Sequence, residues 1–354
     1  MKPSISFLLL GSMMLANLCC LAQTASFAED SISFMSDGYK ISGTISYPNT
    51  KGKAPAIILV WGNGPHTRDQ RISGTPMFRE MADYFNRQGY AVMRLDKRGF
   101  GKSEGPKGQS ESVTTSADLS NDIHEALQLL KRNKRVNAAS IGLMGHSEGA
   151  WIAEMVAVRD TTVKWLVALA GHLANGGLVR ELQMTENLTR LGAEPEVVER
   201  VRPQIKRLVE FVRKDYNNDS MYYAIGADFL RAHGVQDSAI THKFIDQLLD
   251  AFRSPWVQYF FSHAPADTVA ALRCPALFVF GDRDRNISPA LNIPALAAAM
   301  QKSDNPNLKA SVLADHDHFF LHYNGKSLER HKPGEMHVSV RMLKEVSAWM
   351  ETVR

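Results

Sequence analysis

The chain has 354 residues, 44% of them hydrophobic, so it is long enough to bury a large core in one big α/β domain with insertions or in two smaller domains. Its net charge is only +4, and acidic and basic residues are interspersed. This pattern argues against a nucleic-acid partner and against a polybasic membrane-binding patch.

The N-terminal segment has the pattern of a secretory signal. An apolar run over residues 5–22 is followed by small residues around position 28, where a signal peptidase needs them. We predict cleavage after Ala28 and a secreted or periplasmic protein without stable membrane association; alternatively, the uncleaved run anchors the chain. Cleavage leaves Cys274 as the one cysteine of the mature chain, which predicts a fold without an internal disulfide and a buried structural thiol.

Strand and helix patterns alternate along the first half of the mature chain. Residues 31–35 and 39–47 are expected to pair as antiparallel strands that turn at Asp37-Gly38. The next expected elements are a strand at 56–60, a helix carrying Met77, Met81, Tyr84 and Phe85 that stops at Gly89, a strand at 90–95, a helix marked by Leu119, Ile123, Leu127 and Leu130, a strand at 141–144, a helix from Ala150, and a strand at 165–170. This order predicts a mostly parallel central sheet with helices on both faces.

Residues 173–271 interrupt the alternation with helical periodicity alone, and we interpret them as a cap inserted into the sheet domain. The cap carries a cluster of aromatic and apolar residues, which either pack it onto the body or line a substrate pocket. The members are Met221, Tyr222, Tyr223, Trp256, Tyr259, Phe260 and Phe261. Strands are expected again at 275–280 and 308–313, and a helix with Met342, Val346 and Trp349 follows.

The segment Gly145-His146-Ser147-Glu148-Gly149 lies between an apolar strand and a helical pattern. A serine hydroxyl is a weak nucleophile, and a tight strand-to-helix turn can lift it toward a base and an oxyanion hole. Glycines on both sides let the strand and the helix approach closely. Ser147 is therefore the predicted nucleophile.

Such a serine needs a histidine base and a carboxylate that orients it. Candidates for both follow the last two expected strands, at 281–285 and 314–320, in the chain order serine, acid, histidine. The aspartates and histidines at 315–318 could also be interpreted as metal ligands, but no second cluster in the sequence completes such a site.

With these motifs the chain resembles the α/β-hydrolase superfamily over nearly its whole mature length, and especially bacterial secreted esterases and serine-aminopeptidase-like members. The resemblance implies an α/β-hydrolase fold whose core consists of residues 29–172 and 272–354, after a signal peptide at 1–28, with the cap at 173–271 between them.

The same resemblance implies the identity of the acid and the base. In these relatives the acid loop reads glycine, two variable residues, aspartate, and the histidine often precedes phenylalanines. Asp284 is then the acid and His318 the base, with Asp282 and His316 as the local alternatives.

Two backbone N–H groups should form the oxyanion hole. One is that of Glu148, and the other is expected from Asn63 in Trp61-Gly-Asn-Gly-Pro, which resembles the His-Gly-Ser-Gly-Pro loop of these enzymes with tryptophan in place of histidine. Alternatively, the glycines of this loop simply make a turn. A further matching turn contains Asp96 and Arg98, to which we assign a structural role.

The expected reaction is hydrolysis of a carboxylic ester of a small molecule through an acyl-enzyme, without cofactor or metal. Peptide hydrolysis is the main alternative, and it would need a carboxylate such as Glu148, Glu181 or Glu186 to hold a free amine. A thioesterase is a third possibility. A noncatalytic binding protein on a hydrolase scaffold is a fourth, because a fold alone does not define a function.

Overall fold

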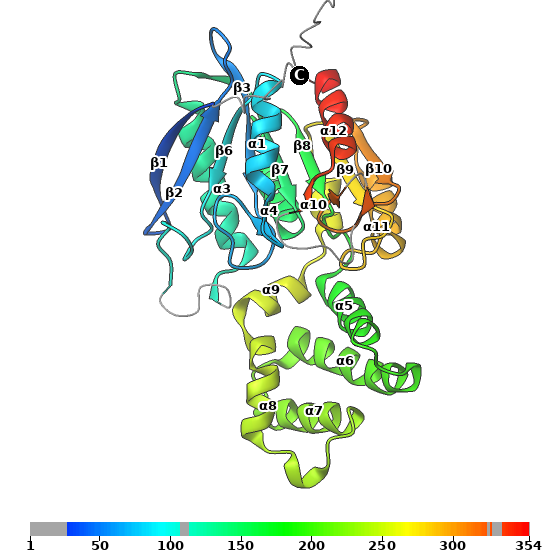
Figure 1. Cartoon of the computed structure of the whole chain (residues 1–354). Helices are drawn as coiled ribbons and strands as arrows, with labels where there is room; N and C mark the ends of the chain where they lie inside the picture. Colours follow the sequence, from blue (N-terminus) through cyan, green and yellow to red (C-terminus); the bar gives the residue numbers. More distant parts are fainter. Residues whose placement is uncertain (1–26, 107–112, 324–325, 328–334, 354) are drawn as a thin grey trace, which may run out of the picture.

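The protein is described here by a computed structural model that covers residues 27–106, 113–323, 326–327 and 335–353 (Figure 1). The predicted signal segment lies outside these residues, except for its last two positions. None of the helices in the described part is long and apolar enough to span a bilayer.

An eight-stranded sheet forms the centre of the molecule, in the order β1-β2-β6-β3-β7-β8-β9-β10. Its strands are β1 (Ala28–Ser36), β2 (Tyr39–Tyr47), β3 (Ala54–Val60), β6 (Ala91–Leu95), β7 (Val136–His146), β8 (Leu166–Leu169), β9 (Ala276–Gly281) and β10 (Leu308–Leu313). β2 pairs antiparallel with β1 and β6, and every later pair in this order is parallel. The first hairpin turns at Asp37 and Gly38, whose φ values are 47° and 81°.

Short strands form two small additional sheets. β4 (Arg71–Ile72) pairs with β5 (Thr75–Pro76), and β11 (Leu321–Tyr323) lies between β12 (Lys326–Ser327) and β13 (His337–Val338). β13 contacts the first helix of the body, α1 (Met77–Arg87), so this late strand packs against an early helix of the chain.

Helices cover the sheet in two groups, and the helices of each group contact one another (Figure 1). The first group is α1 (Met77–Arg87) with α12 (Val340–Val353), and the second is α3 (Ser116–Lys131), α4 (Glu148–Arg159), α10 (Pro265–Ala270) and α11 (Pro289–Lys302). The buried residues of α1 repeat at helical spacing, and Gly89 after it has a φ of 88°. The predicted parallel sheet with helices on both faces is confirmed.

Between β8 and β9 the chain forms a helical cap (Figure 1). It consists of α5 (Gly176–Arg190), α6 (Pro195–Asp215), α7 (Asp219–Ala232), η1 (Asp237–Ala239), α8 (His242–Leu249), η2 (Asp250–Arg253) and α9 (Pro255–Ser262). Because β8 is a parallel strand of the sheet, its carboxyl end delivers the cap to the edge where ligands bind in such folds. α9 also contacts α3 of the body.

Glu154 on α4 is a buried acid without a hydrogen-bond partner. The residue is 0% exposed, and neither carboxylate oxygen has a partner among the described residues. Burial raises the pKa of this carboxyl well above its ordinary value. A folded-state pKa above the unfolded one means that the folded state binds more protons between the two values, so stability falls as the pH rises through this window.

We therefore expect Glu154→Leu to raise the free energy of unfolding at pH 8 by about 1–3 kcal/mol, because it removes an unsatisfied polar group from the core. The gain should shrink toward pH 5, where keeping the buried acid protonated costs the folded wild type little free energy. Urea denaturation at both pH values measures it. Glu196→Leu, at an exposed position of α6, is the control and should change the same quantity by less than about 0.5 kcal/mol. A destabilised Glu154→Leu at pH 8 would contradict the prediction.

Candidate active site

Ser147 stands at the turn between β7 and α4, with φ 56° and ψ −122°. This left-handed backbone is unusual for a serine, and the close packing around it holds it in place. A Cβ added to Gly145 would lie 2.0 Å from the carbonyl oxygen of Gly149, and one added to Gly149 would lie 2.2 Å from that of Val60. Both glycines are therefore required by the strand-to-helix contact, as the sequence pattern predicted.

The structure brings Ser147, His318 and Asp284 together from three loops. The Ser147 hydroxyl donates to His318 Nε2 over 3.0 Å, and His318 Nδ1 donates to Asp284 Oδ2 over 2.8 Å. Ser147 follows β7, Asp284 follows β9, and His318 follows β10. This geometry, a nucleophile bonded to a base and the base to a buried acid, is the arrangement that activates a serine.

Asp284 is held as a carboxylate by its surroundings. It is 3% exposed, and its Oδ1 accepts hydrogen bonds from the backbone N–H groups of Asn286 and Ile287 at 2.8 and 2.7 Å. Burial raises the pKa of this acid, but the charge and hydrogen bond of His318 and the two N–H groups outweigh burial and lower it overall. Asp284 can therefore stabilise a protonated His318.

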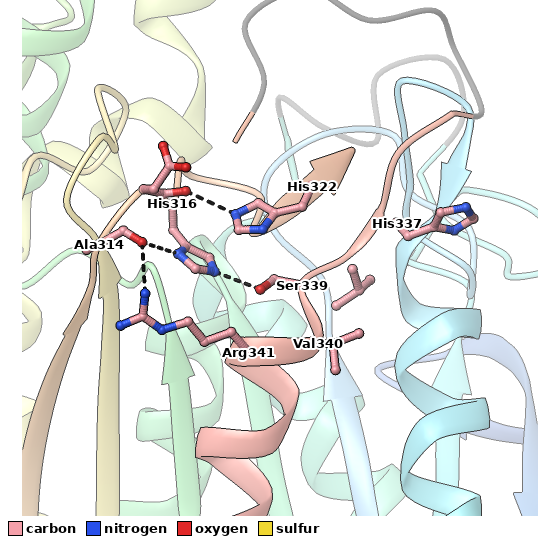
Figure 2. Close-up of a pocket in the computed structure, with 9 residues that line it drawn as sticks. Ala314, His316, His322, His337, Ser339, Val340 and Arg341 are labelled. Atoms are coloured by element: carbon pink, nitrogen blue, oxygen red, sulfur yellow. Dashed lines mark hydrogen bonds between the residues drawn. The ribbon is translucent and has the colours of Figure 1, made fainter. Parts of the chain in front are cut away.

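The local alternatives lie elsewhere. Asp282 is exposed and accepts from the backbone N–H of His316 at 3.3 Å. His316 donates from Nδ1 to Ala314 O at 2.9 Å and accepts at Nε2 from the Ser339 hydroxyl at 2.7 Å, as Figure 2 shows. Both nitrogens of His316 are thus occupied inside a separate cavity that does not include the Ser147 hydroxyl.

The residues at 315–318 do not converge on one point. Asp315 pairs with Arg283 at 2.7 Å, and His316 and His318 use their ring nitrogens in the bonds given above. Within the part of the chain that the structure describes, no group of three or more histidine, cysteine, aspartate or glutamate side chains could hold a metal ion.

Both expected oxyanion donors lie beside the serine. The N–H of Glu148 opens α4, a position without an intrahelical acceptor. The N–H of Gly62 is used, since it donates to Gln70 Oε1 at 2.8 Å, which leaves the N–H of Asn63 as the next donor of the loop. Asn63 and Glu148 both line a small cavity with Ser147.

Trp61, which replaces the histidine of the related loops, has a structural contact. It is fully buried, and its indole Nε1–H donates to Leu95 O at 2.6 Å, which fastens the loop to the end of β6. Lys97 holds the same loop through its Nζ, which donates to Gly62 O at 3.2 Å. The same Nζ lies 3.4 Å from Glu148 Oε2. The sequence pattern did not single out Lys97.

Glu148 itself is a buried carboxylate with several donors. Besides Lys97, it accepts from the Ser116 hydroxyl at 2.6 Å and from Trp256 Nε1 of the cap at 2.7 Å. Burial raises the pKa of Glu148, but the Lys97 charge and these hydrogen bonds outweigh it and lower the pKa overall. This carboxylate therefore serves to join the cap to the strand-to-helix turn at Ser147, which we call the elbow.

Asp96 and Arg98 tie loops together as expected. The Asp96 carboxylate accepts from the backbone and side chain of Arg68 and from the N–H of Lys102, while Arg98 pairs with Asp122 at 2.6 Å. Cys274 is half-buried, and burial raises the pKa of its thiol to about 11, which makes it an unreactive structural residue.

A second histidine, His146, connects the base to the oxyanion loop. His146 Nε2–H donates to the backbone oxygen of His318 at 2.8 Å, and its Nδ1 accepts from Gln70 Nε2 at 3.0 Å. Burial is the main cause that lowers the pKa of His146, to about 3, so the ring is neutral as this pattern requires. Gln70 is fully buried and adopts a strained φ of 38°. Through its oxygen on Gly62 it completes a chain of hydrogen bonds from one side of the site to the other.

We expect Gln70→Leu to lower kcat/KM about 10- to 100-fold, because it frees the N–H of Gly62 and lets the oxyanion loop and His318 shift relative to each other. Steady-state kinetics with an ester substrate measures the loss, and a melting curve verifies that the variant is folded. Gln88→Leu, at an exposed residue after α1, is the control and should retain wild-type kinetics. A folded Gln70→Leu with at least half of the wild-type kcat/KM would show that the chain of hydrogen bonds is not needed.

The space in front of Ser147 lies between the body and the cap. One cavity of about 240 Å³ includes Ser147, His318 and Phe319, and a smaller one of about 60 Å³ includes Ser147, Trp256 and Phe260. The cap's aromatic cluster is thus divided. Trp256 and Phe260 line the smaller cavity, whereas Tyr222 and Phe261 are fully buried in packing contacts; Met221 is 46% exposed.

The fold and this site define an α/β hydrolase. Residues 73–318, well over half of the chain, match the family model described as serine aminopeptidase, S33. The chain therefore belongs to this family of hydrolases, and the resemblance noted in the sequence is confirmed.

The chain is also similar to individual known proteins. The chain is similar to the esterase EstD of Thermotoga maritima, with 26% identity over 313 residues, which are 88% of this chain and 65% of EstD; it thus spans less than two thirds of that esterase's length. It is also 25% identical over 293 residues to an uncharacterised 31.7 kDa protein of Escherichia coli, covering 82% of this chain and 92% of that one. Among solved structures, the esterase Pf2001 of Pyrococcus furiosus has the same fold, with a TM-score of 0.57 over 92% of both chains at 14% identity.

Proposed function

We propose that the protein is a serine hydrolase that cleaves carboxylic esters through an acyl-enzyme. The observation that carries the proposal is the continuous hydrogen-bonded line from Ser147 through His318 to the buried Asp284. Ser147 Oγ attacks the ester carbonyl and transfers its proton to His318 Nε2. In this mechanism the N–H groups of Glu148 and Asn63 bind the oxygen that becomes negative, and the shared cavity that both residues line with Ser147 supports this role.

The reaction then divides into two halves. When the tetrahedral intermediate collapses, the C–O bond to the alcohol breaks, and His318 gives its proton to the leaving oxygen. Water attacks the acyl-Ser147 ester, His318 takes a proton from it, and collapse returns that proton to Ser147 Oγ. The carboxylic acid leaves, so no cofactor is consumed and the enzyme returns to its initial state.

Several contacts favour an ester over a peptide. An aminopeptidase needs a carboxylate beside the scissile bond to hold the substrate's amine. Glu148 is the acidic residue among those that line the two cavities at Ser147, and it is already paired with Lys97. Glu186 lines an outer hollow that includes His318 and lacks Ser147, and Glu181 lines none of these three spaces.

The experiment compares p-nitrophenyl acyl esters of increasing chain length with aminoacyl-p-nitroanilides. We expect faster turnover of the esters, with a preference for short acyl chains that reflects the small cavity. Preferential turnover of the anilides would transfer the assignment to the peptidase. A fluorophosphonate probe tests the nucleophile independently: the native protein should carry the adduct on the peptide with Ser147, and denatured protein should not. A native protein that resists labelling would refute the mechanism.

A further inference from the structure

One positive side chain lies in the substrate space without an acidic partner. Arg180 is on α5 of the cap, and it lines both cavities that include Ser147. Among the described residues, no carboxylate forms an ion pair with its guanidinium, and no hydrogen bond to it is formed. The guanidinium lies over the ring of Phe252, with the Arg180 Cζ 5.7 Å from the ring centroid.

The turn of α5 that carries Arg180 is attached to the loop that carries Asp284. Gln183, one turn further along α5, donates from Nε2 to the backbone oxygen of Asn286 at 3.0 Å. Asn286 belongs to the loop that also holds Asp284, so this turn of the cap is attached to the catalytic loop. Burial lowers the pKa of Arg180, and no nearby acid compensates for it. A guanidinium nevertheless stays charged at neutral pH and has five N–H donors to offer.

A second unsatisfied polar atom lies in the same small cavity. His172 is 1% exposed and lines this cavity, and its Nε2 has no hydrogen-bond partner among the described residues. Burial lowers the pKa of His172 to about 4, so the ring is neutral and can offer one N–H. Buried polar groups are nearly always paired in native proteins, and an unpaired one in a residue that lines a cavity is available to a ligand.

The charged residues that line the two cavities leave Arg180 without a counter-charge. Glu148 is the acidic residue among them, and Lys97 lies against it, so this pair contributes no net charge. The carboxylate of Asp284 is bonded to His318 and lines neither cavity, so the positive charge that faces a bound substrate is that of Arg180. An apolar ester would strip water from the guanidinium without replacing its hydrogen bonds, which is costly.

We propose that the substrate carries a carboxylate in its acyl part, and that Arg180, assisted by His172, binds it. The inference rests on the proposed ester hydrolysis and specifies its substrate class as half-esters of short dicarboxylic acids. The acyl part is favoured because the small cavity is lined by both candidate oxyanion residues, Glu148 and Asn63. His318, which protonates the leaving alcohol, lines the larger cavity.

The test uses the methyl half-esters of succinic, glutaric and adipic acids, each paired with the neutral methyl ester of the corresponding monoamide. Acid release in a pH-stat at neutral pH gives kcat/KM for each. We expect the wild type to prefer the carboxylate over the amide about tenfold to a hundredfold for at least one chain length, the worth of a charge-assisted hydrogen bond. In Arg180→Gln this ratio should fall to near one, and Arg180→Lys should restore part of it.

Arg207→Gln is the matched control, because Arg207 is an exposed arginine on α6 of the cap that lines none of the three spaces near His318, and its ratio should equal that of the wild type. A wild type without preference, or a preference that survives in Arg180→Gln, would overturn the proposal. The proposal would also be overturned if the enzyme preferred 4-acetoxybenzoate over 4-acetoxybenzamide but showed no preference for the half-esters over their monoamides. The enzyme would then bind a carboxylate in the alcohol part of the ester and not in the acyl part. Failure of the proposed function itself is recognised separately, by the absence of fluorophosphonate labelling.

Discussion

Ser147→Ala is expected to lower kcat/KM for an ester about 10⁴- to 10⁶-fold, the loss found when the nucleophile of a triad is removed. The variant keeps the oxyanion donors and both cavities, but no atom remains to form the acyl-enzyme. Steady-state rates and the loss of the fluorophosphonate adduct measure the effect. The fold should persist, because alanine removes a single hydroxyl and tolerates the same backbone no worse than serine.

Ser140→Ala is the control for Ser147→Ala. Ser140 lies on the same strand, β7, well before the elbow. Its replacement should leave kcat/KM within about threefold of the wild type, as is usual for a substitution that touches none of the site. If Ser147→Ala retained a tenth of the wild-type rate, Ser147 would not be the nucleophile.

Asp284→Asn is expected to lower kcat about 10⁴-fold, by analogy with the same change in a serine-protease triad. The amide oxygen can still accept from the N–H groups of Asn286 and Ile287, so the loop keeps its shape. The amide NH₂ then faces His318 Nδ1, which turns the ring into the tautomer that cannot accept the serine proton. The lost negative charge also removes the stabilisation of protonated His318.

The neighbouring aspartate provides the control for Asp284→Asn. Asp282→Asn makes the same chemical change two residues earlier in the loop, at an exposed side chain whose described contact is the N–H of His316. We expect its kcat to stay within about threefold of the wild type. A larger loss of kcat in Asp282→Asn than in Asp284→Asn would show that Asp284 is not the acid of the site.

The parts of the site that sequence predicted are those with a local signature. The glycines around Ser147 mark a strand-to-helix contact that few other residues tolerate, and β10 begins and ends at the residues expected. Asp284 follows β9, a fully buried apolar strand, and His318 follows β10, the next parallel strand, so their place at one edge of the sheet follows from the strand order.

The residues that sequence did not predict act through contacts between distant segments. Gln70 and Lys97 lie in loops without a periodic pattern, and their roles depend on the side chains of His146 and Glu148, which only the folded chain brings near. His146 stands beside the nucleophile in the sequence, but nothing in its neighbours shows that it bonds to the backbone of His318.

The cap illustrates the same limit. Its helices were predicted from their 3.6-residue period, yet an arginine on an amphipathic helix is ordinarily solvated. That Arg180 lines the cavities at Ser147 depends on how α5 packs on the acid loop, and a helical period carries no information about that packing.

Ser147 and His318 are 171 positions apart in the sequence, which determines when activity appears during synthesis and folding. During synthesis the elbow and its sheet neighbours emerge first, but the base cannot reach the serine until β10 has added to β9 at the sheet's far edge. A partly synthesised or partly folded chain is therefore catalytically inactive. Catalytic power arrives with one of the last steps of folding, so recovery of activity after denaturation should report completion of the whole molecule and not of its first half.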